Sequence, residues 1–324
     1  MFKIPYHSKD LNEFSFLITG GAGFIGSNLV EYLLKYGAKK VRILDNLITG
    51  FEYNIDEFKS NPAFEFINGD IRDLETCKRA VEGMDYVSHQ AALGSVPRSI
   101  DDPITSNEVN VTGFLNMLCA VKDNHNIKRL VYAASSSTYG DNVGLPKLED
   151  KIGRPLSPYA VTKYVNELYA DVFATTYGIE TIGLRYFNVF GPKQCPEGAY
   201  AAVIPLFIQA AKEGRSATIN GDGEQTRDFT FIENVIQANM KSFFVESPDA
   251  INQIYNVACN ESVTLNQLWE LINKIENKNI PPVYQEYRLG DIKDSLADIS
   301  KAKNKLDYQP EFDLKKGLEV TINY

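Results

Sequence analysis

Three regularly spaced glycines between an apolar segment and a helical pattern constrain the fold of this chain most. Residues 14–19 have the composition of a short buried strand, and residues 27–36 place apolar side chains at helical spacing. Gly20, Gly23 and Gly26 form a G-x-x-G-x-x-G loop between them. Such glycines allow a tight turn, close approach of backbone to a pyrophosphate, and close packing of helix on strand. The sequence therefore predicts a strand–turn–helix unit that binds a dinucleotide.

The next strand indicates which dinucleotide binds. It ends at Asp45, about 20 residues after the loop, where a carboxylate can bond the adenosine ribose and would repel a 2′-phosphate. We therefore expect NAD rather than NADP; the alternative is a glycine turn with Asp45 as a helix cap. Further cofactor contacts are expected beside the loop and at the ends of later strands, from Phe24, Ile25, Asn46, Asp70, Ile71, Gln90, Ala91 and Ala92.

Strands and helices alternate as far as about residue 185, and the pattern then loosens into short mixed elements. This alternation is typical of an α/β fold with a Rossmann-like, doubly wound parallel sheet. We predict an NAD-binding Rossmann domain over residues 1–184, with residues 1–12 as an N-terminal arm. Residues 185–324 are predicted to form a smaller mixed α/β substrate-binding domain, of which roughly 229–258 packs back on the first domain.

A tyrosine and a lysine four residues apart indicate the chemistry. Tyr159 and Lys163 share one face of a predicted helix that begins at the good N-cap Ser157 and at Pro158. An ammonium group beside a phenol favours phenolate and lowers a pKa of about 10. The pair therefore predicts a general base that takes a proton from an alcohol, and the dinucleotide loop favours this reading over an ordinary exposed helix pair.

The composition excludes several classes of partner. A net charge of −9 and a pI near 5.0 argue against nucleic acid. No segment reaches the roughly 18 apolar residues of a membrane span, and the start is too charged for a signal peptide. The four cysteines have no metal-site spacing and suggest reduced thiols. We expect a cytoplasmic protein without a metal site.

Together the motifs resemble the extended short-chain dehydrogenase/reductase superfamily. The segments that carry the resemblance are "TGGAGFIG", "GDIRD", "YAVTK", "RYFNVFGP", "GDGEQTRDF" and "RLGDIKDSLADISKA", in the family's order over nearly the whole chain. "HQAALGSVPRS" and "GAYAAVIP" are similar to bacterial UDP-N-acetylglucosamine 4-epimerases. The resemblance implies dimers built through a four-helix bundle, for which the candidates are residues 105–124 and the Tyr159 helix continuing to Tyr177.

The resemblance also implies a reaction. Tyr159 removes the proton from the 4-hydroxyl of a sugar while carbon 4 gives hydride to NAD, and the hydride returns to the opposite face of the keto sugar. Lys163 also holds the nicotinamide ribose, and Ser135 bonds the 4-oxygen, with Ser136 or Ser137 as alternatives for that role. Because NAD ends the cycle unchanged, it is expected to stay tightly bound.

The substrate implied is a UDP-sugar. The resemblance places Asn188, Arg227, Arg288 and Asp291 on its diphosphate and ribose. Epimerases restricted to non-acetylated sugars carry a bulky tyrosine where this chain has Ser295, so we expect a preference for UDP-GlcNAc and UDP-GalNAc and weaker activity on UDP-Glc and UDP-Gal. UDP-uronates stay open, because Arg98 could face a carboxylate. The other expected substrate contacts are Gly94, Ser95, Ser136, Ser137, Ala202 and Val203.

Two further functions stay open at this point. One is net oxidation or elimination on a nucleotide sugar, for which relatives carry an acidic residue just after the catalytic serine or threonine. This chain has Ser136 and Ser137 there, which counts against it. The other is a non-catalytic NAD-binding sensor, and the intact pair of Tyr159 and Lys163 counts against that.

Overall fold

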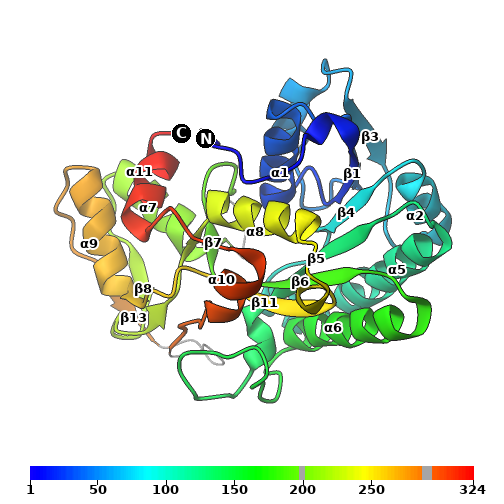
Figure 1. Ribbon diagram of the computed structural model, residues 1–324. Coiled ribbons are helices and arrows are strands. Elements are labelled where there is room, and N and C mark those ends of the chain that lie inside the picture. Colours follow the sequence, from blue (N-terminus) through cyan, green and yellow to red (C-terminus); the bar gives the residue numbers. More distant parts are fainter. Residues whose placement is uncertain (197–200, 287–293) are drawn as a thin grey trace.

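A parallel sheet of seven strands forms the centre of the computed structural model, which describes residues 1–196, 201–286 and 294–324 (Figure 1). In spatial order the strands are β11 (Gln253–Val257), β6 (Thr181–Tyr186), β5 (Arg129–Ser135), β4 (Tyr86–His89), β1 (Ser15–Thr19), β2 (Lys40–Asp45) and β3 (Phe64–Asn68). The chain passes from β1 outward to β2 and β3 and then returns to β4 on the other side of β1. Ligands of open parallel sheets bind at the carboxyl ends of the strands at such a reversal. The predicted Rossmann-like, doubly wound fold is confirmed.

Helices cover both faces of this sheet (Figure 1). One core lies under α1 (Phe24–Lys35) and α8 (Ile232–Phe244), and the other lies under α2 (Leu74–Val81), α5 (Gly113–Asp123) and α6 (Pro158–Tyr177). Strand β1 serves both cores, because its successive side chains point to opposite faces. Phe16 and Ile18 join the first core, and Leu17 joins the second.

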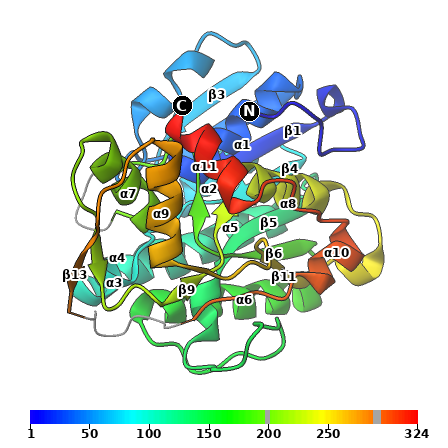
Figure 2. The same ribbon diagram turned by 90° about the vertical axis from the view of Figure 1, so that its left-hand side faces the viewer.

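The remaining elements gather beside the sheet, at the left of Figure 1 and facing the viewer in Figure 2. They comprise α7 (Val203–Lys212), α9 (Leu265–Ile275), α11 (Leu314–Ile322) and the strand pairs β7 (Val189–Phe190) with β10 (Thr230–Phe231), β9 (Thr226–Arg227) with β12 (Val263–Thr264), and β8 (Thr218–Asn220) with β13 (Val283–Gln285). Trp269 is buried against Phe207 here. The domain boundary at residue 184 stays a prediction; between residues 229 and 258, β11 joins the central sheet and α8 covers it.

Short helical segments connect the larger elements. Residues 103–123 form one helical run in which α4 (Pro103–Asn107) continues through a π-helical turn, Glu108–Thr112, into α5. The other short segments are α3 (Val96–Asp101), α10 (Ser300–Leu306) and the 3-10 turns Leu11–Glu13, Glu52–Asn54, Asp56–Phe58, Ser136–Tyr139 and Pro248–Ala250.

The first residues of the chain pack on helix α1. Phe2 and Leu11 are fully buried, and the backbone N–H of Tyr6 donates to the hydroxyl of Tyr32 at 2.6 Å. This N-terminal arm therefore contributes to the core that supports the glycine loop.

Candidate active site

The glycine loop lies between β1 and α1, and its shape leaves no room for side chains. A Cβ atom on Gly26 would stand 2.1 Å from the carbonyl oxygen of Gly20. A Cβ on Gly20, whose φ is +69°, would stand 2.8 Å from the backbone nitrogen of Ala91. Gly23 caps α1 without a side-chain hydrogen bond, so the first N–H groups of the helix face the loop. Such a helix start is suited to a phosphate anion.

A cavity of about 310 Å³ opens in front of this loop. It is lined by twelve of the residues named from the sequence, which are Gly20, Gly23, Phe24, Ile25, Gly26, Asp45, Asn46, Ile71, Gln90, Ala91, Ala92 and Gly94. Gly94 was expected on the substrate side and lies here. Sequence reasoning missed Leu44, Ile48, Thr49, Gly50, Gly69, Leu93 and Val109, which complete the lining. These residues are apolar, small or contributed by loops, and they form no motif.

Asp45 ends β2 at this cavity. Its two carboxylate oxygens accept hydrogen bonds from the backbone N–H groups of Ala22, at 2.9 Å, and Leu47, at 2.8 Å. Burial raises its pKa, and these two hydrogen bonds oppose the rise. A carboxylate has about four acceptor positions, so it can still accept a ribose hydroxyl. The glycine cradle, the free helix start and this acid together fit NAD.

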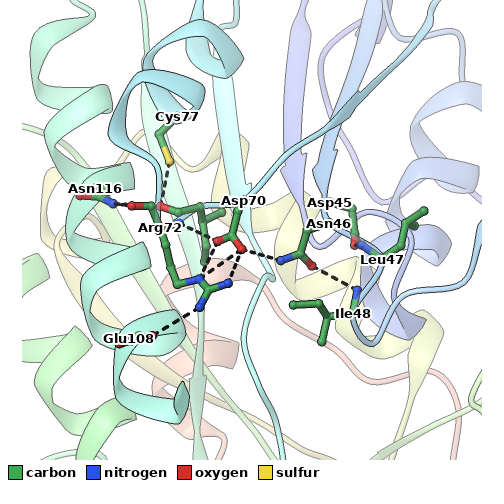
Figure 3. A network of polar contacts seen from close by, with 10 residues as sticks. Asp45, Asn46, Leu47, Ile48, Asp70, Arg72, Cys77, Glu108 and Asn116 are labelled. Carbon is green, nitrogen blue, oxygen red and sulfur yellow. Dashed lines mark hydrogen bonds and ion pairs between the residues drawn. The ribbon is translucent and has the colours of Figure 1, made fainter. Parts of the chain in front are cut away.

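Asp70 is not among the residues that line this cavity. Figure 3 shows the polar contacts of its side chain. Its carboxylate accepts hydrogen bonds from Arg72, at 2.7 Å, and from the side-chain amide of Asn46, at 2.8 Å. Hydrogen bonding to Arg72 is the main reason that its pKa falls to about 2. Asn46 in turn accepts the backbone N–H of Ile48. The cofactor contact expected of Asp70 stays a prediction, and in the structure its carboxylate holds Asn46, which lines the cavity.

Helix α6 begins where the sequence predicts and presents the tyrosine in its first turn. Ser157 accepts the backbone N–H of Ala160 as N-cap, and Pro158 occupies the first helical position. The N–H of Tyr159 donates to the Ser99 hydroxyl of α3 at 3.0 Å. Ser99 could not be found from sequence, because the contact spans 60 residues.

Ser135 and Lys163 lie around Tyr159. Ser135, at the end of β5, lies within hydrogen-bonding reach of the Tyr159 side chain, and its hydroxyl also accepts a hydrogen bond from the Ser137 hydroxyl at 2.8 Å. The Lys163 ammonium donates to the carbonyl of Ala133 at 2.8 Å and lies 6.0 Å from the centre of the Tyr159 ring. The structure thus brings together the three residues predicted to be catalytic.

The expected effect of Lys163 on Tyr159 is corrected by the structure. Burial raises the pKa of the Tyr159 phenol, and the hydrogen bond with Ser135 offsets this only in part. Burial also lowers the pKa of Lys163 to about 8, although Glu167 opposes the change. The buried environment disfavours the charged form of each of the two side chains. A phenolate at Tyr159 therefore needs positive charge beyond that of Lys163.

A buried ion pair lies next to Lys163 on the same helix. Glu167, one helical turn after Lys163, is held by Arg185 of β6 through two hydrogen bonds of 2.8 Å. Both side chains are almost fully buried, with 3% and 2% of their surface exposed. His89, at the end of β4, is buried, hydrogen-bonded to Thr19 and packed on Phe114, which favours a role in packing.

A second cavity of about 380 Å³ adjoins the first, since Gly94 lines one and Ser95 the other. Five residues predicted for substrate line it: Ser95, Asn188, Ala202, Val203 and Arg227. Ser95 and Asn188 have φ values of +100° and +34°, which non-glycine residues rarely adopt and which often mark ligand sites. Its other polar lining residues, Gln194, Thr218, Asn220 and Gln225, were missed, because they come from distant parts of the chain: two loops and the strand β8.

The other predicted substrate residues lie elsewhere. Arg98, Ser136 and Ser137 are absent from the lining of both cavities. Ser295 is half-buried in the segment that precedes α10. Arg288 and Asp291 lie outside the residues that the structure describes.

Comparison with known proteins decides the family. The family model described as "NAD dependent epimerase/dehydratase family" matches residues 16–258. The chain belongs to this family. As a family member it uses NAD, for which the glycine loop, Asp45 and the first cavity are suited.

Three relatives of this epimerase/dehydratase illustrate what it is similar to. A putative UDP-glucose 4-epimerase of Methanocaldococcus jannaschii is 37% identical, over 95% of this chain and 97% of the relative. A solved UDP-N-acetylglucosamine 4-epimerase of Methanobrevibacter ruminantium, in complex with UDP-N-acetylmuramic acid, is 39% identical with a TM-score of 0.90, covering 96% and 97%. A UDP-glucuronic acid 4-epimerase of Bacillus cereus, solved with its sugar nucleotide and NAD, is 32% identical with a TM-score of 0.88, covering 96% and 98%.

Helices that could span a membrane and clusters of metal-binding side chains are both absent from the residues that the structure describes. Among residues 1–196, 201–286 and 294–324, no helix is long and apolar enough to cross a membrane. The same residues contain no group of three or more histidine, cysteine, aspartate or glutamate side chains that could hold a metal ion.

Proposed function

We propose that the protein is a 4-epimerase of UDP-sugars that keeps its NAD bound through the cycle. One observation carries the proposal: Ser135 and Lys163 lie around Tyr159, whose backbone N–H is held by Ser99 of α3. The start of α3 lines the second cavity, which Arg227 and Asn188 also line, directly after Gly94 of the dinucleotide cavity. A guanidinium group suits a diphosphate. Elimination and net redox are less well supported, because Ser136 and Ser137 stand where an acid would be needed.

Ser135, Tyr159 and Lys163 each have a separate role in the proposed reaction. Ser135 holds the 4-oxygen of the sugar, and Tyr159 takes and later returns the proton of the 4-hydroxyl. Lys163 holds the nicotinamide ribose, while its contact with Ala133 fixes its direction. The bound cofactor supplies reversible hydride transfer at carbon 4 and positive charge near the phenol. Between the two transfers the keto sugar presents its other face.

We propose that the preferred substrates are UDP-GlcNAc and UDP-GalNAc. The support comes from residue size: this chain has the small Ser295 where epimerases restricted to non-acetylated sugars carry a bulky tyrosine, and a serine suits an N-acetyl group at carbon 2. A relative that binds UDP-N-acetylmuramic acid is 39% identical to this chain, which supports an acetylated sugar. Relatives that act on UDP-glucose and UDP-glucuronate make these sugars the competing substrates in any test.

Exchanging Ser295 for tyrosine tests the choice of sugar. Because a bulky ring fills the space of the N-acetyl group, we expect Ser295→Tyr to lower kcat/KM for UDP-GlcNAc by about 10–200-fold while sparing UDP-Glc. Ser295→Ala is the matched control and should retain the wild-type preference. Equal loss on both sugars would contradict the assignment of Ser295, and activity confined to UDP-glucuronate would replace the proposed substrate.

We also propose a homodimer built through α6 and the run of residues 103–123. Apolar side chains on α6 stay exposed at helical spacing: Val161, Leu168 and Val172 are 48%, 50% and 53% exposed. Such a stripe on a long helix is suited to a second copy of the chain.

The dimer is tested by one charge on this stripe. We expect Leu168→Glu to shift the molar mass measured by light scattering from two chains to one, because a buried unpaired carboxylate opposes association. Val143→Glu, at a loop residue that is 94% exposed, is the control and should stay dimeric. A wild-type protein that runs as a monomer at micromolar concentration would overturn this proposal.

A further inference from the structure

Asp228 is a buried acid at the wall of the second cavity. None of its surface is exposed, and its neighbours in sequence, Arg227 and Phe229, both line the cavity. Its backbone carbonyl accepts the side-chain amide of Asn188 at 3.1 Å, and Asn188 lines the cavity as well. The reaction described above gives Asp228 no part.

The Asp228 carboxylate joins two distant segments of the chain. One oxygen accepts the backbone N–H of Cys259 at 3.0 Å, and the other accepts that of Ala297 at 3.2 Å. The backbone N–H groups of Asn260 and Glu261 also stabilise its charged form. These contacts span 31 and 69 residues, so the acid ties the loop after β11 and the segment before α10 to strand β9.

The segment 294–298, which contains Ser295, is held at several further points. The Thr226 hydroxyl donates to Asp294 at 3.0 Å. On the other side Lys147 pairs with Ala297 in a β-bridge, donating to Leu296 at 2.8 Å and accepting from Asp298 at 3.0 Å. Ser295 therefore stands between an anchor at residue 294 and anchors at residues 296 and 297.

We propose that Asp228 is a positioning residue that docks the segment 294–298 on the substrate cavity and thereby sets the place of Ser295. This inference rests on the proposed function, since it assigns Ser295 to the sugar. The backbone carbonyl of Asp228 is hydrogen-bonded to Asn188, which lines the cavity, and its carboxylate is hydrogen-bonded to Ala297. Asp228 therefore links one wall of the cavity to the segment that carries Ser295.

The charge state of Asp228 supports this role. Burial raises its pKa to about 7, because a carboxylate without water is costly. The titratable groups that face it are the Cys259 thiol and the Tyr308 phenol. Burial and the charge of Asp228 raise the pKa of Cys259 to about 12 and that of Tyr308 well above its ordinary value. Arg227, the last residue of β9, is the cation next to Asp228 in sequence. Glu261 lies in the loop after β11. Asp294 belongs to the docked segment, and the backbone of Lys147 is hydrogen-bonded to that segment. As the pH falls through 7, Asp228 gains a proton, and the backbone N–H that faces the protonated oxygen loses its acceptor.

The test uses the purified full-length protein with its bound NAD. Asp228→Asn keeps the shape but turns one acceptor into a donor that faces a backbone N–H. We expect the KM for UDP-GlcNAc to rise about tenfold, with kcat changed less than about threefold and the NAD content unchanged. Asp298→Asn is the control, because the Asp298 carboxylate accepts the N–H of Ser300 at the start of α10, which an asparagine can also accept, and its backbone bonds are unchanged.

Two further readouts separate positioning from general stability. The KM of the wild type should rise as the pH is lowered from about 8 to about 6, and that of Asp228→Asn should stay flat. If Asp228→Asn does not fold, Thr226→Val carries the test, with an expected rise in KM of about threefold. An unchanged KM in the variant that folds, or equal losses in KM, kcat and NAD content, would overturn the inference.

A failure of the role proposed for Asp228 can be distinguished from a failure of the proposed epimerase function. If the wild type converts no UDP-sugar, the function fails, and UDP binding measured by calorimetry then tests the docking alone. Weaker UDP binding by Asp228→Asn than by Asp298→Asn would still support the role of Asp228. Equal binding by the two variants would overturn it.

Discussion

Replacing Tyr159 with phenylalanine is expected to lower kcat for epimerisation by about a thousandfold, because the hydroxyl proposed to take the sugar proton is removed. The fold and the NAD content should not change, since the ring stays and the backbone N–H of Tyr159 keeps its bond to Ser99. Turnover measured by NMR of the sugar nucleotides, with bound NAD measured after denaturation, gives both quantities.

A matched control exists on the same helix. Tyr177→Phe removes the same hydroxyl at the far end of α6, about 27 Å from Tyr159 along the helix axis. Its ring packs on Phe173 and under Lys122, contacts that a phenylalanine retains. Full activity of Tyr177→Phe beside an inactive Tyr159→Phe would support the general base. A Tyr159→Phe variant with near wild-type kcat would refute it.

The second large effect is expected at the glycine loop. In Gly26→Ala the new Cβ would stand 2.1 Å from the carbonyl oxygen of Gly20, a backbone atom that cannot move without opening the turn. Such overpacking costs about 1–3 kcal/mol of unfolding free energy and displaces the backbone that receives the pyrophosphate. We expect the purified variant to contain less than about a tenth of the wild-type NAD and to melt at a lower temperature.

Gly144→Ala serves as the control for this change. Its Cβ would meet only the side chain of Asn142, at 3.1 Å, in an exposed loop. This variant should keep its NAD and its melting temperature. A Gly26→Ala protein that retained stoichiometric NAD would show that the first cavity is not the pyrophosphate site.

Features encoded by neighbouring residues could be predicted from sequence. The glycine loop, the end of β2 at Asp45, and the start of α6 at Ser157 and Pro158 each follow from a few consecutive residues and the geometry they allow. Such local rules hold whatever the rest of the chain does. For that reason the sheet, the cofactor cavity and the catalytic helix were expected before the structure.

Features formed by distant segments could not be predicted in the same way. The second cavity takes residues from α3, β7, α7, β8 and β9, so Asn220 and Gln225 carry no recognisable signal. The hydrogen bonds of Asp70 with Arg72 and Asn46 could not be predicted either, because a sequence motif does not show which carboxylate already has hydrogen-bond donors within the protein. Asp228 belongs to the same group, since its partners lie 31 and 69 residues away.

The charge states of buried side chains are a third kind of feature, and the sequence alone does not predict them. Sequence spacing placed an ammonium group near the Tyr159 phenol and suggested a lowered pKa. Burial reverses the direction, because both side chains lose water on folding and neither charged form is favoured. The extent of that burial is a property of the whole fold.

The most direct test of the proposed function is turnover of UDP-GlcNAc by the purified protein with no NAD added. NMR of the anomeric protons should show UDP-GlcNAc and UDP-GalNAc reaching equilibrium from either side, faster than UDP-Glc and UDP-Gal. That result requires bound NAD, oxidation at carbon 4 and room for the N-acetyl group together. A protein that contains NAD but leaves UDP-GlcNAc, UDP-Glc and UDP-glucuronate unchanged would contradict the assignment as a UDP-sugar 4-epimerase.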